Sequence, residues 1–173
     1  IERVNSIIQA IDDATIPQDV LHNKSLELDD ISSLKANLEG NIYGKRTAKY
    51  ILLRLDMILH GHNQKKAIPD TISIEHILPQ NPKEDSQWCI DFTSEDRDEW
   101  THKIGNLALL SRRKNSSQNN RDYTVKKERY FKGNIELFSN SIRIYQEHSA
   151  WRLEDLKKNH DYVSNKLISS FTV

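Results

Sequence analysis

The sequence predicts an α+β fold that is mostly helical, with one small hairpin of strands. Two observations predict this class. Six segments repeat their apolar residues at helical spacing, and two other apolar runs are short enough to be strands. The length of 173 residues suits one compact domain. We expect a helical scaffold over residues 1–66, a core of two strands and a helix over 67–133, and closing helices over 134–173.

Helices account for most of the expected elements. The strongest signal is the run 46–60, because its apolar residues form a wide surface and Gly61 follows as a stop signal. In the last segment, Leu153, Leu156 and Val163 begin a stripe with the same period. The predicted helices cover residues 1–11, 29–38, 46–60, 124–132, 134–146 and 151–171.

The two predicted strands lie between the helical segments. Residues 71–77 alternate and are rich in β-branched side chains, and Pro79 ends this run. Residues 104–110 form the second apolar run, and a short helix is predicted over 111–116. The polar, acidic segment 80–103 between the strands is expected to be a loop with at most one helical turn.

The distribution of charge excludes some classes of protein. Lys plus Arg equals Asp plus Glu at 25 each, so the chain is not a uniformly basic DNA-coating protein. Residues 111–132, however, hold eight basic side chains and two acidic ones, whereas 83–99 hold seven acidic and two basic. The basic segment can meet phosphates, and the alternative is a solvated helix face with ion pairs.

The remaining composition bears on location. A single cysteine, Cys89, cannot form an internal disulfide or a zinc site of cysteine pairs, so we expect a cytoplasmic protein. No run approaches the roughly 18–20 apolar residues of a membrane span. The chain begins with Ile1 rather than Met, and we therefore expect it to be a fragment of a longer protein.

Three polar clusters follow one another on the predicted strand, strand and helix. They read I-E-H-I-L-P-Q over 74–80, I-G-N-L-A-L-L over 104–110 and S-R-R-K-N-S-S over 111–117. In this order and spacing the sequence resembles the HNH (ββα-metal) nucleases. More narrowly, it is similar to the C-terminal domain of GmrSD-type restriction enzymes and to SspE-like C-terminal nuclease domains. The resemblance implies a hairpin-and-helix nuclease core embedded in flanking helices.

The residue types suit phosphodiester hydrolysis. His76 is the candidate general base, because an imidazole with a pKa near 6.5 can accept a proton from water near neutrality. Glu75 and Asn115 offer hard oxygen ligands without a thiolate, which suits Mg²⁺ or Mn²⁺. By resemblance, Asn106 braces the hairpin and orients His76. Asn119 and Asn120 are rivals to Asn115 for the second ligand position.

Other side chains are candidates for binding or support. Basic residues in the cationic segment are expected to hold the DNA backbone. His102 belongs to the resembling motif and, like Asn119, is a candidate support for the site, whereas His22, His148 and His160 are expected at the surface. The three tryptophans are expected to pack rather than to stack on bases. The candidate DNA contacts are Arg112, Arg113, Lys114, Lys126 and Lys127.

One geometric conflict follows from the motif itself. Neighbouring residues on a strand point to opposite faces, so Glu75 and His76 can flank one phosphate only if the strand ends or bulges there. Pro79, three positions later, is consistent with an ending.

These observations predict a metal-dependent HNH endonuclease domain that cuts or nicks double-stranded DNA in a restriction or anti-phage protein. The resemblance also implies an N-terminal sensor domain that handles nucleotides in the same protein. Two alternatives stay open: a non-catalytic DNA-binding or interaction module derived from such a nuclease, and an RNA-cutting toxin.

Overall fold

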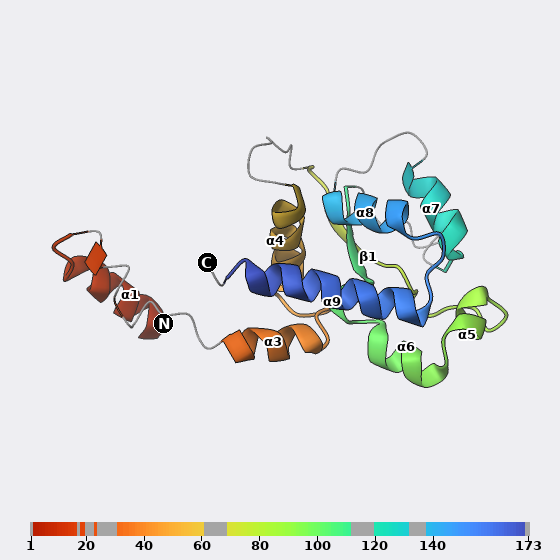
Figure 1. The fold of residues 1–173 in the computed structure, drawn as a ribbon, viewed down its shortest axis with the longest axis horizontal. Helices are drawn as coiled ribbons and strands as arrows, with labels where there is room; N and C mark the ends of the chain where they lie inside the picture. The colour runs from red at the N-terminus through yellow and green to blue at the C-terminus, as the bar shows by residue number, and fades with distance from the viewer. Residues whose placement is uncertain are drawn as a thin grey trace. The chain divides into compact units, whose positions relative to one another are not determined.

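The computed structural model describes residues 2–16, 18–19, 23, 31–60, 69–111, 120–131 and 138–171. The chain divides into two compact units, residues 1–34 and 35–173. Helices dominate the described residues, and two strands form one antiparallel sheet (Figure 1). The predicted mostly helical α+β class is therefore confirmed.

The first unit contains helix α1 (Glu2–Asp12), which overlaps the helix predicted over 1–11. After the helix, the Asp19 carboxylate accepts hydrogen bonds from the Thr15 amide, the Thr15 hydroxyl and the Ile16 amide, at 2.9–3.1 Å. One side chain thus satisfies the donors of the turn that follows α1.

The second unit carries the remaining predicted elements, and α3 (Ile31–Glu39) spans the boundary between the units. Each element overlaps the segment in which the sequence predicts it. The remaining elements are α4 (Ala48–His60), β1 (Ser73–His76), β2 (Leu107–Leu110), α7 (Tyr123–Phe131), α8 (Ser139–Glu147) and α9 (Leu153–Ser169).

Of the helices in the described part of the chain, none combines the length and the apolar character needed to cross a membrane.

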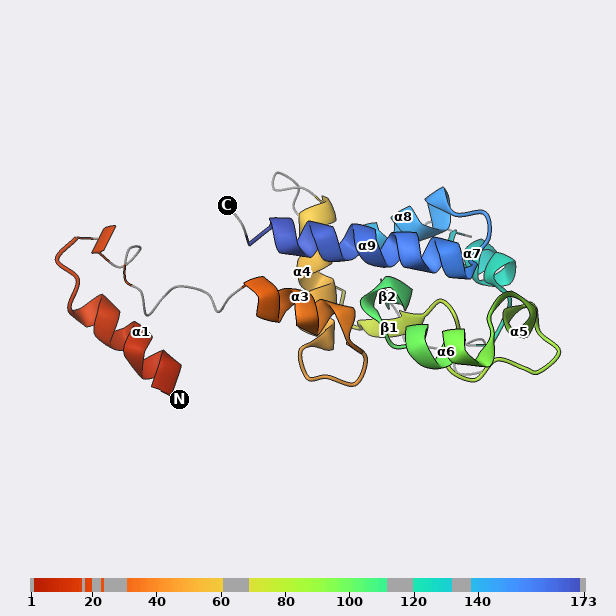
Figure 2. The same cartoon turned by 60° about the horizontal axis from the view of Figure 1, so that its bottom comes forward.

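The β1–β2 hairpin lies at the centre of the second unit (Figure 2). Its antiparallel register pairs Glu75 with Ala108 and His76 with Leu107. All four residues of β2 are buried, because α4 and α8 both pack against this strand. Helix α9 packs against α4 and against the 3₁₀ turn η2 (Ile104–Asn106), which leads into β2. The strand predicted over 104–110 therefore begins only at Leu107.

The segment between the strands differs from its prediction as a loop. It forms two short helices, α5 (Gln87–Asp91) and α6 (Ser94–Trp100). Helix α6 begins with a reciprocal cap, in which the Thr93 hydroxyl accepts from the Asp96 amide at 3.1 Å and the Asp96 carboxylate accepts from the Thr93 amide at 3.0 Å. The capping residues are readable in the sequence, but the acidic composition hides the helix from a search for apolar periodicity.

Aromatic side chains form much of the core. The Tyr123 ring stacks on both Tyr145 and Trp151, with ring centroids 5.7 and 5.8 Å apart. Trp88, Trp100 and Trp151 are all buried, which confirms the expectation that the tryptophans pack. The buried cluster comprises Ile77, Leu78, Trp88, Phe92, Trp100, Ala108, Tyr123, Ile144, Tyr145, Trp151 and Leu156.

His160 is buried, and its predicted surface position is wrong. It lies on the inner face of α9, where its ring meets Trp100 edge to face at a centroid distance of 5.5 Å. The Glu39 carboxylate lies 3.7 Å from its Nε2 atom. Burial lowers the pKa of His160, and the nearby Glu39 carboxylate opposes this shift.

The lowered pKa of His160 predicts sensitivity to acid. The unfolded chain binds a proton on this histidine near pH 6.5, whereas the folded protein binds it only at lower pH. Its contribution to stability is therefore present above pH 6.5 and decreases as the pH falls. We expect the melting temperature of His160→Leu to decline less between pH 7.5 and 5.5 than that of the native protein. Equal declines in thermal scans would contradict the assignment.

Candidate active site

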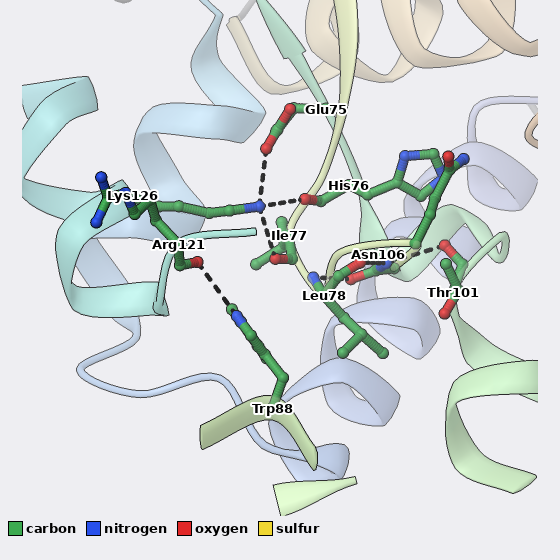
Figure 3. A network of polar contacts seen from close by, with 10 residues as sticks. Glu75, His76, Ile77, Leu78, Trp88, Thr101, Asn106, Arg121 and Lys126 are labelled. Atoms are coloured by element: carbon green, nitrogen blue, oxygen red, sulfur yellow. Dashed lines mark hydrogen bonds and ion pairs between the residues drawn. The ribbon is translucent and has the colours of Figure 1, made fainter. Parts of the chain in front are cut away.

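Asn106 joins three segments at the base of the hairpin. Its side chain is fully buried, and its Oδ1 atom accepts a hydrogen bond from the Leu78 amide at 2.8 Å. Its Nδ2 atom donates to the carbonyls of Leu78 and Thr101, both at 2.9 Å (Figure 3). In addition, the Ile77 amide donates to the Asn106 backbone carbonyl at 3.0 Å. These bonds hold the residues immediately after His76.

We predict that Asn106→Ala destabilises the folded protein by about 2 kcal/mol, because it leaves a buried amide and two buried carbonyls without this partner. Urea denaturation checks this value. Leu78 follows the strand that carries His76, so we also expect slower catalysis in this variant. A free energy of unfolding within about 0.5 kcal/mol of the native value would show that water replaces the amide.

The imidazole of His76 lies against side chains from three other places in the chain. Its Nε2 atom is 3.3 Å from Nδ1 of His102 and 3.2 Å from the Gln80 side-chain nitrogen. The Tyr43 ring meets His76 edge to face, with centroids 4.2 Å apart, and stacks on His102 at 5.5 Å. His76 is 1% exposed, but Gln80 is exposed and His102 is half-buried. The two side chains within reach of its Nε2 atom therefore reach the surface themselves.

Backbone pairing explains the position of Tyr43. The amides of Ile42 and Tyr43 both donate to the His102 carbonyl, at 2.9 and 3.2 Å, and Asn41 forms an isolated bridge with Lys103. Sequence reasoning assigned Tyr43 no role, because nothing local to residues 41–43 indicates that they pair with a segment about 60 positions later. Gln80 is the last residue of the motif over 74–80, and nothing in the sequence indicated its own contact with His76.

Glu75 points away from His76, as the alternation of a strand requires (Figure 3). Its Oε1 atom accepts from the Lys126 ammonium at 2.8 Å, and both side chains are 2% exposed. The strand ends at His76 without turning the two side chains to a common side. The described geometry therefore places Glu75 and His76 on opposite sides of β1.

Several predicted site residues are not where the sequence places them, or cannot be placed. Lys126, expected to hold DNA, is buried with its ammonium against Glu75. Lys127 is half-buried and donates to the His148 carbonyl at 3.0 Å, whereas Asn120 is exposed in a turn. All but the first residue of the short helix predicted over 111–116 also fall outside the described residues, together with Arg112, Arg113, Lys114, Asn115 and Asn119.

The arrangement around Glu75 does not fit the expected divalent cation. The Lys126 ammonium already supplies positive charge at Oε1, and a second cation beside it would be repelled in a buried, low-dielectric environment. Among the residues that the structure describes, no three His, Cys, Asp or Glu side chains form a group that could hold a metal. Asn115, the other expected ligand, is not described.

Comparison with known proteins identifies the family. The family model described as "GmrSD restriction endonucleases, C-terminal domain" matches residues 28–165, which is most of the chain. Comparisons with curated proteins and with solved structures gave no match. The matched range includes the whole hairpin, the Asn106 turn and the contacts of His76. The chain therefore belongs to the C-terminal domain family of the GmrSD restriction endonucleases, and its domain is a restriction nuclease domain.

Proposed function

We propose that this domain hydrolyses phosphodiester bonds of double-stranded DNA and that His76 is the general base. The observation that carries the proposal is the environment of the His76 Nε2 atom, which lies within hydrogen-bond distance of Gln80 and His102. An amide nitrogen can only donate, so the contact from Gln80 supports the tautomer in which Nε2 is the unprotonated nitrogen of the ring. A general base needs its reactive nitrogen in this state.

In the proposed reaction, a water molecule replaces the Gln80 amide as the partner of Nε2. The His76 imidazole takes a proton from this water while the water oxygen forms a bond to phosphorus. The bond from phosphorus to the leaving nucleotide oxygen breaks. His102, with Nδ1 at 3.3 Å from Nε2, is close enough to donate to a phosphoryl oxygen at the same place. The leaving oxygen is protonated from solvent.

The substrate and partners are part of the proposal. Family membership favours DNA as the substrate, and exposed cations that the structure describes, Arg121 and Arg129, lie in the cationic segment. We further propose a cytoplasmic location and control by an N-terminal nucleotide-handling domain in the same protein. A requirement for Mg²⁺ or Mn²⁺, implied by the family resemblance, stays a prediction, and no step above is routed through a metal.

The test is a side-by-side digest of supercoiled plasmid and a structured RNA, with Mg²⁺, with Mn²⁺ and with EDTA. Conversion of plasmid to nicked or linear DNA, with intact RNA, is the expected result. Preferential loss of the RNA would favour an RNA-cutting toxin. Plasmid binding without conversion under every condition would instead indicate a non-catalytic DNA-binding module.

A further inference from the structure

A buried lysine cation lies directly beside the backbone of the proposed general base. The Lys126 ammonium, which reaches in from α7, donates to Glu75 Oε1 at 2.8 Å, to the His76 carbonyl at 2.7 Å and to the Ile77 carbonyl at 3.0 Å (Figure 3). Lys126 is 2% exposed. An ammonium has three N–H donors, and these three oxygens take them up.

This arrangement is incompatible with a contact between Lys126 and a DNA phosphate. To reach DNA, the side chain would leave a buried carboxylate and two backbone carbonyls, and Glu75 would lose its buried ion pair. The adjacent Lys127, which donates to a single backbone carbonyl at the half-buried surface, has no such constraint. Neighbouring lysines on one helix therefore have different roles.

Lys126 and Asn106 hold the same stretch of backbone through different groups. Lys126 binds the carbonyls of His76 and Ile77, whereas Asn106 binds the amides of Ile77 and Leu78. The His76 imidazole projects from this stretch toward His102, on the side opposite Glu75. A shift of the backbone by part of an ångström would move Nε2 relative to its partners.

We infer that Lys126 is a positioning residue for His76 and that Glu75 acts through Lys126 rather than as a metal ligand. This inference rests on the proposed function, because it assigns a role in the reaction of His76. It replaces both expectations from the sequence, a DNA contact for Lys126 and a metal ligand for Glu75. The positive charge beside the backbone of the general base is then the Lys126 ammonium, which helix α7 of the same chain supplies.

The experiment compares Lys126→Met and Glu75→Gln in single-turnover plasmid cleavage, with DNA concentration and Mg²⁺ or Mn²⁺ concentration varied separately. For Lys126→Met we expect the rate at saturating DNA to fall at least tenfold and the half-saturating DNA concentration to change less than twofold. For Glu75→Gln, whose amide oxygen can still accept from Lys126, we expect a severalfold slower rate and an unchanged half-saturating metal concentration.

The matched control is Lys158→Met, which removes an exposed lysine charge from α9. It should leave the rate within twofold of the native value. Since Lys126→Met removes the ammonium from a buried ion pair, a second variant, Glu75→Leu with Lys126→Met, removes both charges and protects the fold. We expect this double variant to melt at a higher temperature than Lys126→Met and to remain at least tenfold slower than the native protein.

A measurement that does not depend on catalysis separates this inference from the proposed function. In spectra of protein labelled on histidine, Lys126→Met should shift the His76 ring resonances, whereas Lys158→Met should not. A Lys126→Met variant that weakens DNA binding at an unchanged maximal rate would overturn the inference in favour of a DNA contact. A tenfold rise in half-saturating metal for Glu75→Gln would overturn it in favour of a metal ligand. Failure of His76 variants to slow cleavage would instead overturn the proposed function.

Discussion

Replacement of His76 by alanine is expected to slow plasmid cleavage about a thousandfold, within the range that a general base contributes. The substitution removes the imidazole that takes the proton from water in the proposed reaction, while the neighbouring His102 and Gln80 remain. The measurement is the single-turnover rate of conversion of supercoiled plasmid to nicked circles, at saturating protein.

The interpretation requires a folded variant, because the His76 ring is buried against Tyr43. We therefore pair His76→Ala with His76→Gln, which keeps more of the side-chain volume, and compare the melting temperatures of both with the native value. His148→Ala is the matched control, because it removes a half-buried imidazole that packs on Trp151. If the native protein and both folded His76 variants nick plasmid equally fast, His76 is not the base.

The fold was predictable to the extent that its elements carry local signals. The run of apolar residues in α4 and the β-branched alternation of β1 are repeated patterns within one segment, and both elements form where the patterns lie. Helix α6 is an element whose stability comes from a cap and from one buried tryptophan, so its composition resembles that of a loop. His160 lies on the apolar stripe of α9 between Leu156 and Val163, so its burial has a local sign, whereas its contact with the distant Trp100 has none.

The candidate site divides in the same way. His76 and Asn106 lie in motifs whose spacing in the sequence singles them out, and the hairpin register brings these motifs together. The alternation of a strand also predicted that Glu75 and His76 point apart, and they do. The partner of Glu75 was not predictable, because Lys126 lies 51 residues away on a helix whose charged residues all read as surface. Long-range pairing of this kind leaves no periodic trace in the sequence.

Gly105→Ala should destabilise the domain by at least about 3 kcal/mol, at the upper end of the usual cost of overpacking. A methyl group at this position would lie 2.5 Å from Cβ, 2.6 Å from Cα and 2.8 Å from the amide nitrogen of His160. Two of these are backbone atoms of α9, so no rotation of a side chain can relieve the clash. The measurement is the free energy of unfolding from urea denaturation.

The control for this prediction is Gly40→Ala, where the added methyl group would meet only the carbonyls of Ala36 and Asn37, both at 3.7 Å. That contact is ordinary, so we expect a change within about 1 kcal/mol. The comparison isolates the effect of close packing, because the added methyl group meets α9 only at Gly105. The Gly105 carbonyl also accepts from Asn159 of α9 at 2.7 Å, and Asn106 follows directly in the chain. A methyl group that pushes α9 outward would thus pull on the turn that holds Leu78, and we expect cleavage to slow together with the loss of stability. Equal stabilities of the two variants would show that α9 does not approach the turn this closely.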